Sequence, residues 1–368
     1  MRLLFDHQIF SLQSRGGISR YFWELASRLR RDGVDLAIRA GLHRSLVLRE
    51  HPAAWVHGRY LAPWPKTGPL RRALNAALTR RHFRRHPPDL VHETYFRPGS
   101  AYAPARPTVV TVFDLIHFKF PAEVTEGEEV RSDLRAAVAR ADRVLCISET
   151  TRRDLLELLP SLDPARVRAI PLGGLELQPH TAPPAPPPGL DAPFLLHVGL
   201  RAGYKNFDLV LRCLAESPRL RAQFHLVAFG GPPFTRDELA RIQSLGLDAG
   251  RIRHRAGDDA ALAACYAHAA ALVCPSRYEG FGLTPLEAMA HGRPVLCSIA
   301  GSFPEVVGDA AVTFDPAQPA DLARAIQSLV DSPGLAAELR ARGPRQAARF
   351  SWDRCAAETL AVYRELTG

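Results

Sequence analysis

Short apolar runs alternate with helical patterns along most of the chain. In the first half, a run at Leu3–Phe5 precedes a helical pattern over Ser19–Arg31, and in the second half a run at Phe194–Val198 precedes one over Phe207–Glu216. Alternation of this kind is typical of parallel sheets covered by helices. The pattern therefore predicts an α/β protein.

Further apolar runs predict the remaining strands of two sheets. They are Leu90–His92, Thr108–Phe113, Arg143–Ile147, Val167–Pro171, Phe224–Phe229, Arg251–His254, Ala271–Cys274 and Pro294–Cys297. From Asp321 to Leu366 the periodicity is helical, and we expect interruptions at Pro333-Gly334 and Gly343-Pro344, where Gly and Pro disfavour a helix interior. A final helix is expected after Phe350-Ser351-Trp352.

The length of 368 residues favours two domains, because one hydrophobic core seldom organises so long a chain. Pro179–Gly189 contains six prolines in eleven residues, which favours an extended linker. We expect doubly wound, Rossmann-like domains at 1–178 and 190–349, and a C-terminal helix at 350–368 that packs back toward the first domain. A cleft between two such domains is a natural ligand site.

The composition is that of a soluble globular protein, with 46% apolar and 23% charged residues. No apolar run is long enough to span a membrane, and Asp6 and His7 interrupt the apolar start of the chain, so we expect a cytoplasmic protein. The six cysteines are scattered without a CxxC pair and are expected to be buried free thiols. They are Cys146, Cys213, Cys265, Cys274, Cys297 and Cys355.

The positive charge is concentrated in the first half of the chain. Residues 1–180 contain 28 Lys+Arg and 19 Asp+Glu, whereas residues 181–368 contain 19 of each. His51–Pro88 contains eight basic residues and no carboxylate. We expect a negatively charged partner to approach this segment.

The stretch Ala271–Gly292 reads as a strand, a glycine-bearing loop and a short helix. Thr284 suits an N-cap, Pro285 a first helical position, and Gly292 the helix end. Gly280 and Gly282 allow a ligand to approach the backbone, and the free amides of the helix start attract anions. The loop therefore predicts a diphosphate site.

Two carboxylates flank this loop. Glu287 follows Thr284 by three residues, so one interpretation is a capping box in which Glu287 only bonds the Thr284 amide. Glu279 has no such interpretation, because a carboxylate beside an anion site is unfavourable unless it bonds hydroxyl groups. Sugars supply such hydroxyls.

Glu279 and Glu287 are separated by seven residues, and the stretch resembles the E-x7-E motif of family-four (group 1) retaining glycosyltransferases of the GT-B fold. The resemblance implies that Glu279 meets the hydroxyls of a donor sugar and that Glu287 bonds the ribose of its nucleotide. It also implies retention of anomeric configuration by front-face attack, without a metal. The diphosphate would be held by the amides of Gly280, Phe281, Gly282, Leu283 and Thr284.

Three other segments match this family in the same order along the chain: Ser14–Phe22, His197–Asn206 and Phe350–Asp353. Arg201 and Lys205 would approach the diphosphate from the opposite side, where charge-assisted bonds stabilise a leaving nucleotide. Many relatives space these cations further apart, and a solvated pair at a helix start is the alternative. Gly16 and Gly17 resemble a loop that faces the donor phosphate; a simple tight turn is the alternative.

Acceptor-side residues are expected at strand ends of the first domain, which border a ligand cleft in sheets of this type. The candidates are His92 and Glu93 after one strand, and Asp114 and His117 after the next. Each also has a structural interpretation, because a strand-end Asp can cap a helix and a strand-end His is often a satisfied core residue.

Other kinds of site are disfavoured. The chain has neither a G-x-x-x-x-G-K-[ST] loop nor a G-x-G-x-x-G followed by an acid, and Asp258-Asp259 looks like a helix cap and not a metal site. We expect no cofactor and no metal, and a nucleotide-diphosphate sugar as donor. The Tyr204-Lys205-Asn206 variant is similar to mannosyltransferases of surface polysaccharide assembly, which suggests GDP-mannose.

The basic segment suggests a site of action. Leu70, Leu74, Ala77, Leu78 and Phe83 are predicted to share one helical face, flanked by basic residues. Such a helix at 55–88 would place the enzyme at the inner face of an anionic membrane, near a saccharide or lipid-linked saccharide acceptor. A solvated basic helix packed on the core is the alternative, and nucleic acid is disfavoured because aromatic residues are not interleaved.

Two rival functions remain open from the sequence. A nucleotide-sugar epimerase of the same architecture would need the same diphosphate contacts but no acceptor. A non-catalytic module that binds a nucleotide sugar or an anionic surface would tolerate loss of the acceptor-side charges.

Overall fold

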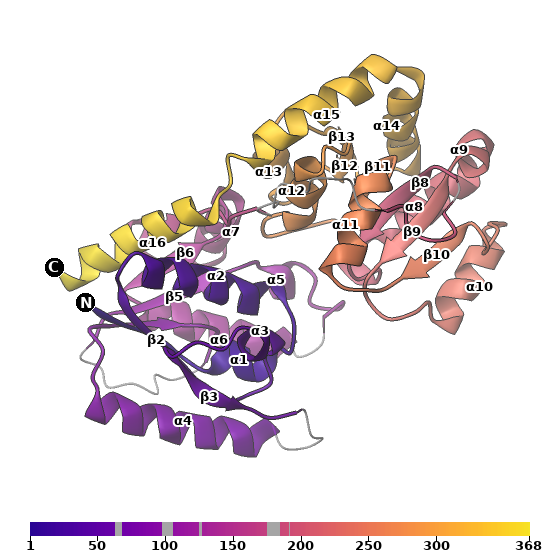
Figure 1. Cartoon of the computed structure of the whole chain (residues 1–368). Coiled ribbons are helices and arrows are strands. Elements are labelled where there is room, and N and C mark those ends of the chain that lie inside the picture. Colours follow the sequence, from indigo (N-terminus) through magenta and orange to yellow (C-terminus); the bar gives the residue numbers. More distant parts are fainter. Residues whose placement is uncertain (63–67, 98–105, 125–126, 175–184, 191) are drawn as a thin grey trace. The chain divides into compact units, whose positions relative to one another are not determined.

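The computed structural model describes the chain except for residues 63–67, 98–105, 125–126, 175–184 and 191. It divides into two compact units, one of Met1–Gly173 with Trp352–Gly368 and one of Gly174–Ser351. Each unit contains one parallel sheet with helices packed against it (Figure 1). Most of the proline-rich segment 179–189 lies outside the described residues.

The first unit is built on a seven-stranded sheet of order β3-β2-β1-β4-β5-β6-β7. Its strands are β1 (Arg2–Phe5), β2 (Asp35–His43), β3 (Val56–Tyr60), β4 (Leu90–Glu93), β5 (Thr108–Val112), β6 (Arg143–Cys146) and β7 (Val167–Ala169). Its helices are α1 (Gln8–Leu12), α2 (Gly17–Arg31), α3 (Leu46–Glu50), α4 (Gly68–Arg85), α5 (Ile116–Lys119), α6 (Gly127–Arg140), α7 (Glu149–Leu158), the 3-10 turn η1 (Pro164–Arg166) and α16 (Trp352–Thr367).

The second unit is built on a six-stranded sheet of order β10-β9-β8-β11-β12-β13. Its strands are β8 (Phe194–Val198), β9 (His225–Phe229), β10 (Ile252–Arg255), β11 (Ala271–Cys274), β12 (Val295–Ser298) and β13 (Val312–Phe314). Its helices are η2 (Gly203–Lys205), α8 (Phe207–Glu216), α9 (Pro218–Gln223), α10 (Arg236–Ser244), α11 (Asp259–His268), α12 (Leu283–Ala290), α13 (Phe303–Val307), α14 (Pro319–Asp331) and α15 (Pro333–Ala347).

The strand order of each sheet fixes where a ligand site can form. The central strands β4, β11 and β12 are buried at every position, because helices cover both faces, whereas the edge strand β3 is largely exposed. The order reverses between β1 and β4 in the first sheet and between β8 and β11 in the second. Loops diverge at such a point and leave a crevice at the carboxyl ends of the strands.

The α/β class and the strands in the predicted regions are present, but three strands were missed. β2 is buried only at alternate positions, β3 lies within the basic segment, and β13 spans only three residues. The predicted helix break at Gly343-Pro344 is wrong, because α15 continues to Ala347. Gly343 packs closely on α12, where a Cβ would lie 3.2 Å from the carbonyl oxygen of Met289.

The predicted apolar face of the basic helix is present only in part, because Phe83 does not share it. In α4 the side chains of Leu70, Leu74 and Leu78 are exposed, whereas Phe83 is buried. Phe83 packs with Leu4 of β1. The other buried side chains described in α4, Asn75 and Thr79, are polar.

The C-terminal helix α16 belongs to the first unit and packs against α2. Asp353, at its start, accepts hydrogen bonds from Arg28 Nε at 3.0 Å and Arg31 Nη2 at 2.9 Å. Trp352 fills the space left by Gly173, where a Cβ would lie 2.3 Å from the indole. The chain therefore starts and ends in the same unit.

The six cysteines are buried and unpaired, as expected. In the part of the chain that the structure describes, no helix is both long and apolar enough to cross a membrane. Asp258 caps α11 through the Ala261 amide at 3.0 Å, and the described residues contain no cluster of three or more His, Cys, Asp or Glu that could hold a metal.

Candidate functional site

The second unit brings the loops after β8 and β11 together at the carboxyl edge of its sheet. Asn206 joins η2 to α8 in the left-handed conformation, with φ 57°, which Asn tolerates better than most residues. Its side-chain amide donates to the carbonyl of Pro275 at 3.1 Å and to that of Pro316 at 2.8 Å. The amide of Arg277 donates to the carbonyl of Tyr204 at 2.7 Å. The two loops are thus fixed to each other.

Lys205 and Glu279 meet where these loops touch. Lys205 Nζ lies 2.7 Å from Glu279 Oε1, and 22% and 17% of the two side chains are exposed, so both remain accessible from one side. Burial by itself lowers the pKa of Lys205, but the Glu279 carboxylate, assisted by Tyr204, offsets this and the net shift of the pKa is upward. The pair therefore offers an ammonium group for phosphate beside a carboxylate for hydroxyl groups.

The backbone of Glu279 is held by residues that the sequence analysis did not identify. Ser302 donates to the Glu279 carbonyl from its amide at 3.1 Å and from its hydroxyl at 3.0 Å. Gly301, with φ +63°, lies so close that a Cβ there would be 2.6 Å from the Glu279 backbone N and O. The available signal was a Gly-Ser pair that begins four residues after the end of the strand predicted at Pro294–Cys297.

The glycine loop ends at a helix start, but the predicted cap is wrong. Helix α12 begins at Leu283 with Gly282 as N-cap, so Thr284 is its second residue and cannot cap it. Gly282 adopts φ +123°, and a Cβ would lie 3.1 Å from the Phe303 ring. The amides of Leu283 and Thr284 belong to the first turn, where helix amides have no intrahelical acceptor. Phe281 is buried, so its ring is not exposed to a ligand.

Glu287 lies in the second turn of α12 and therefore is not part of a capping box. Its Oε2 accepts a hydrogen bond of 2.8 Å from the hydroxyl of Tyr266 on α11. Tyr266 is 1% exposed and stacks on His291. Burial and the Glu287 charge raise the pKa of the Tyr266 hydroxyl, which keeps it a donor. Glu287 is thus oriented by a residue that the sequence analysis missed.

Arg201, which was predicted to bind the diphosphate, is largely used inside the protein. Its Nε lies 2.7 Å from Glu238 Oε1, and its Nη2 donates to Glu238 Oε2 at 3.2 Å and to the carbonyl of Pro232 at 2.7 Å. Its guanidinium also lies 4.7 Å from the centroid of Phe234. Arg201 therefore ties the loop after β8 to the loop before α10, whereas Lys205 extends toward Glu279.

In the first unit, Gly16 and Gly17 form the start of α2. Gly16 is its N-cap in an extended conformation, and a Cβ on it would meet the side-chain oxygen of Gln13 at 2.4 Å. A Cβ on Gly17 would meet nothing within 4 Å. The Gly17 backbone therefore has open space beside it, and Ile18 follows at the edge of a pocket.

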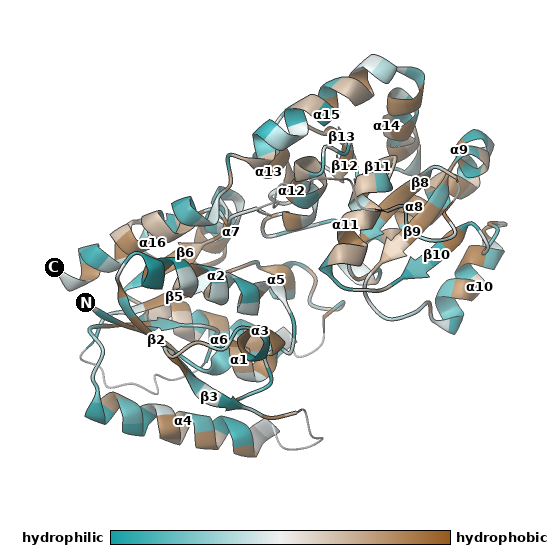
Figure 2. Cartoon of the chain, viewed as in Figure 1, coloured by the Kyte–Doolittle hydropathy of each residue, from teal (hydrophilic) through white to brown (hydrophobic). Residues whose placement is uncertain are grey.

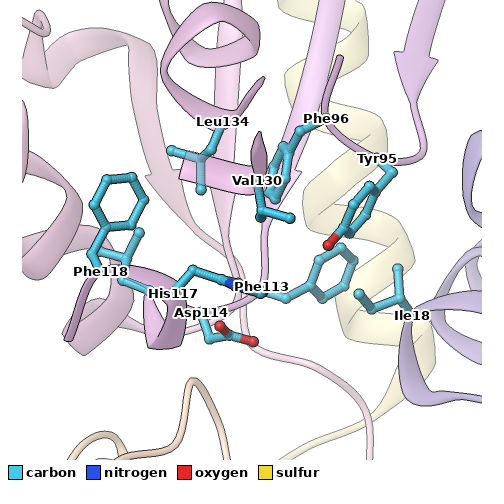
Figure 3. Close-up of a pocket in the computed structure, with 10 residues that line it drawn as sticks. Ile18, Tyr95, Phe96, Phe113, Asp114, His117, Phe118, Val130 and Leu134 are labelled. Atoms are coloured by element: carbon cyan, nitrogen blue, oxygen red, sulfur yellow. The ribbon is translucent and has the colours of Figure 1, made fainter. Parts of the chain in front are cut away.

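That pocket lies at the carboxyl end of β5 and contains two of the four acceptor-side candidates. Asp114 and His117 line a cavity of about 40 Å³, together with the rings of Tyr95, Phe113 and Phe118 (Figure 3). Asp114 Oδ1 accepts from the Ile116 amide, the first of α5, at 3.0 Å, although Leu115 and not Asp114 is the N-cap of that helix. His117 Nδ1 is buried without a hydrogen-bond partner among the described residues. The His117 ring can therefore form a hydrogen bond with a ligand.

His92 and Glu93 are not among the residues that line this pocket. His92 is fully buried between Tyr363 and Thr111, with its Nε2 2.9 Å from the Thr111 hydroxyl, and burial lowers its pKa to about 3. Glu93 is 2% exposed and pairs with Arg140. Burial and the nearby Asp6 raise the pKa of Glu93 to about 7 despite Arg140. The surroundings of His92 match the interpretation that it is a core histidine whose hydrogen bonds are satisfied within the protein.

Both units match known families of proteins. Residues 15–173 match the family model described as Glycosyltransferase Family 4, and residues 182–346 match the one described as Glycosyl transferases group 1. A D-inositol 3-phosphate glycosyltransferase of Acidothermus cellulolyticus is 31% identical over 95% of this chain and 86% of its own length. The O-antigen chain mannosyltransferase B of Escherichia coli is 38% identical over 47% of this chain and 46% of its own.

Solved structures with low identity share the fold. Sucrose-phosphate synthase from Thermosynechococcus elongatus has a TM-score of 0.75 at 21% identity, over 99% of this chain and 98% of its own. Anabaena HepE in complex with UDP and glucose has a TM-score of 0.73 at 18% identity, over 100% of both chains.

Proposed function

Because the chain belongs to the group 1 (family 4) glycosyltransferases, it is a glycosyltransferase, and we propose that it uses a nucleoside-diphosphate sugar as donor. Its fold is the GT-B architecture. We further propose a saccharide or lipid-linked saccharide acceptor and retention of the anomeric configuration, without a metal or a cofactor. The observation that carries the proposal is the Lys205–Glu279 pair beside the first turn of α12.

The donor fits this site by charge. The diphosphate would lie at the amides of Leu283 and Thr284 with Lys205 beside it, because a helix start and an ammonium group both attract anions. Glu279 would accept hydrogen bonds from the sugar hydroxyls, and Glu287, already oriented by Tyr266, from those of the ribose. HepE was solved with UDP and with UDP-glucose, which supports a nucleotide-sugar donor.

The chemical step would proceed on one face of the sugar. The bond between the anomeric carbon and the β-phosphate oxygen breaks, the acceptor oxygen bonds the same carbon, and the acceptor proton passes to the departing phosphate oxygen. Lys205 and the helix amides stabilise the charge that develops on that phosphate. Asp114 and His117 are our candidates for orienting the acceptor hydroxyl, because both line an accessible pocket in the first unit.

A panel of nucleotide sugars tests the donor. We expect one of them, with GDP-mannose and UDP-glucose as the first pair, to raise the melting temperature and to release nucleoside diphosphate when a saccharide acceptor is added. Conversion of the sugar to its epimer without an acceptor would instead assign an epimerase. Binding without release for every acceptor would assign a non-catalytic module.

Glu279→Gln tests the site itself. Loss of a hydrogen bond to a charged group should lower kcat/KM by about 10- to 150-fold while the protein stays folded. Glu216→Gln, an exposed carboxylate on α8 of the same unit, serves as the control and should behave as wild type. Wild-type turnover by Glu279→Gln would remove this residue from the site.

A further inference from the structure

Helix α4 is fixed to the first unit mainly by polar residues. Asn75 is fully buried; its side-chain oxygen accepts from the Leu42 amide at 2.7 Å, and its nitrogen donates to the Leu42 carbonyl at 3.0 Å and the Ser11 hydroxyl at 2.9 Å. One turn later, Thr79 is 3% exposed and its hydroxyl lies 3.2 Å from His7 Nδ1. The leucines of α4 are therefore not what holds it on the sheet.

Those leucines are on the outer side of the helix. The exposed fractions of Leu70, Leu74 and Leu78 are 73%, 43% and 43%, and residues four apart share one side of a helix. Arg81 and Arg85 follow Leu78 by three and seven residues, so they continue the same side toward the C-terminal end of α4. We call these five residues the α4 surface. Figure 2 shows the mixture of hydrophobic and hydrophilic residues along α4.

The apolar part of the α4 surface is unusual within this protein. Nine large apolar side chains are exposed in the described part of the chain, and four of them, Leu61 and the three leucines of α4, lie between residues 61 and 78. Isolated exposed leucines need no explanation, but a cluster marks an interaction site.

The charge around the α4 surface is positive and unopposed. His51–Pro88 contains no carboxylate, and Arg81 and Arg85 have no ion pair among the described residues, nor do their exposed neighbours Arg80 and Arg84. Arg59, on the edge strand β3, is also exposed. A partner of this surface must therefore carry negative charge and also accept apolar side chains.

We propose that the α4 surface docks the protein on an anionic lipid bilayer, with α4 parallel to the membrane plane. The three leucines would enter the boundary between head groups and acyl chains, and Arg81 and Arg85 would bind lipid phosphates. A bilayer satisfies both requirements, whereas a nucleic acid would leave the leucines in water. The α4 surface lies outside the donor site, so this proposal stands or fails independently of the donor.

The test is sedimentation with vesicles. The full-length protein is mixed with vesicles of phosphatidylglycerol and phosphatidylcholine, or of phosphatidylcholine alone, at low and high salt. We expect binding to the anionic vesicles only, weakened by salt. Arg81→Gln with Arg85→Gln should weaken binding about thirtyfold, since each cation near the surface contributes about fivefold. The control removes the same charge elsewhere, by Arg345→Gln with Arg364→Gln, and should bind as wild type.

A second set of variants separates a bilayer from other polyanions. Leu70→Gln, Leu74→Gln and Leu78→Gln together should weaken vesicle binding at least tenfold and leave folding unchanged, because these side chains are exposed. The control is Leu239→Gln, an exposed leucine on α10. Unchanged vesicle binding by the triple variant would overturn the proposal and leave the basic surface to a soluble acidic partner. Equal binding of the wild-type protein to neutral and anionic vesicles would also overturn it.

Discussion

Two cations follow strand β8, and their side chains have different surroundings. In the described part of the chain, Lys205 forms an ion pair with Glu279 and stays partly exposed. The side chain of Arg201 is 3% exposed, and its guanidinium donates hydrogen bonds to Glu238 and to loop carbonyls. The sequence predicted a diphosphate contact for both, whereas the structure leaves Lys205 partly exposed and engages Arg201 within the protein.

Alanine at each position should separate the two roles. Lys205→Ala should weaken nucleoside-diphosphate binding by about 1 to 3 kcal/mol, the range for a lost charged hydrogen bond, with little change in melting temperature. Arg201→Ala should destabilise the protein by about 3 kcal/mol, because it leaves several loop carbonyls without their donor and Glu238 with its Thr235 contacts but no counter-charge. Calorimetric titration and thermal unfolding measure the two effects. A stable Arg201→Ala variant that has lost nucleotide affinity would restore the predicted phosphate contact.

At the scale of elements, the proposed donor site depends on how tightly two loops approach each other. The loop after β12 packs on the loop after β11 through Gly301, whose missing side chain leaves room for the Glu279 backbone. The sequence identified the β11 loop by its glycines but not this supporting loop. Contacts between loops that are distant in sequence leave only weak local signals, in this case one Gly-Ser pair.

Gly301→Ala should therefore impair both stability and donor binding. The new Cβ would be 2.6 Å from two backbone atoms of Glu279, and φ +63° is unfavourable for alanine. We expect a loss of about 2 kcal/mol or more in the free energy of unfolding, measured by urea denaturation, and a weaker nucleotide titration. Gly334→Ala is the matched control, because a Cβ there would meet nothing within 4 Å. Equal stability of the two variants would contradict the role of Gly301.

Over the whole molecule, the chain passes from the first unit to the second and returns. Trp352 begins α16 in the first unit, is 4% exposed, and packs where Gly173 leaves room, beside the ring of Tyr21. The stability of the first unit therefore depends on the last 17 residues of the chain.

Trp352→Ala should loosen the first unit selectively. Removing a buried tryptophan costs about 3 to 5 kcal/mol, and its contacts lie within that unit. Hydrogen exchange should show lost protection in β4 and β5 with little change in β8 and β11. Arg354→Ala, on the exposed side of α16, is the control. Lost protection confined to the second unit would contradict this assignment.

The sequence determined the features that depend on neighbours along the chain. Short apolar runs located most strands, and the glycines around Glu279 located the loop before α12. It failed where local patterns were ambiguous: Thr284 resembles an N-cap, yet the helix begins at Leu283 because Gly282 adopts the N-cap position. The strands β2 and β3 each contain a glycine as well as basic residues, which interrupts the apolar pattern, and they were missed.

Only the tertiary structure decided which side chains meet. It joined Lys205 to Glu279 and Tyr266 to Glu287, engaged Arg201 with Glu238, buried His92, and turned the leucines of α4 outward. Periodicity shows that a helix has two sides but not which side is buried. In α4 that choice was made by Asn75 and Thr79, because a buried polar group that finds its hydrogen-bond partners can fix a helix as firmly as an apolar one.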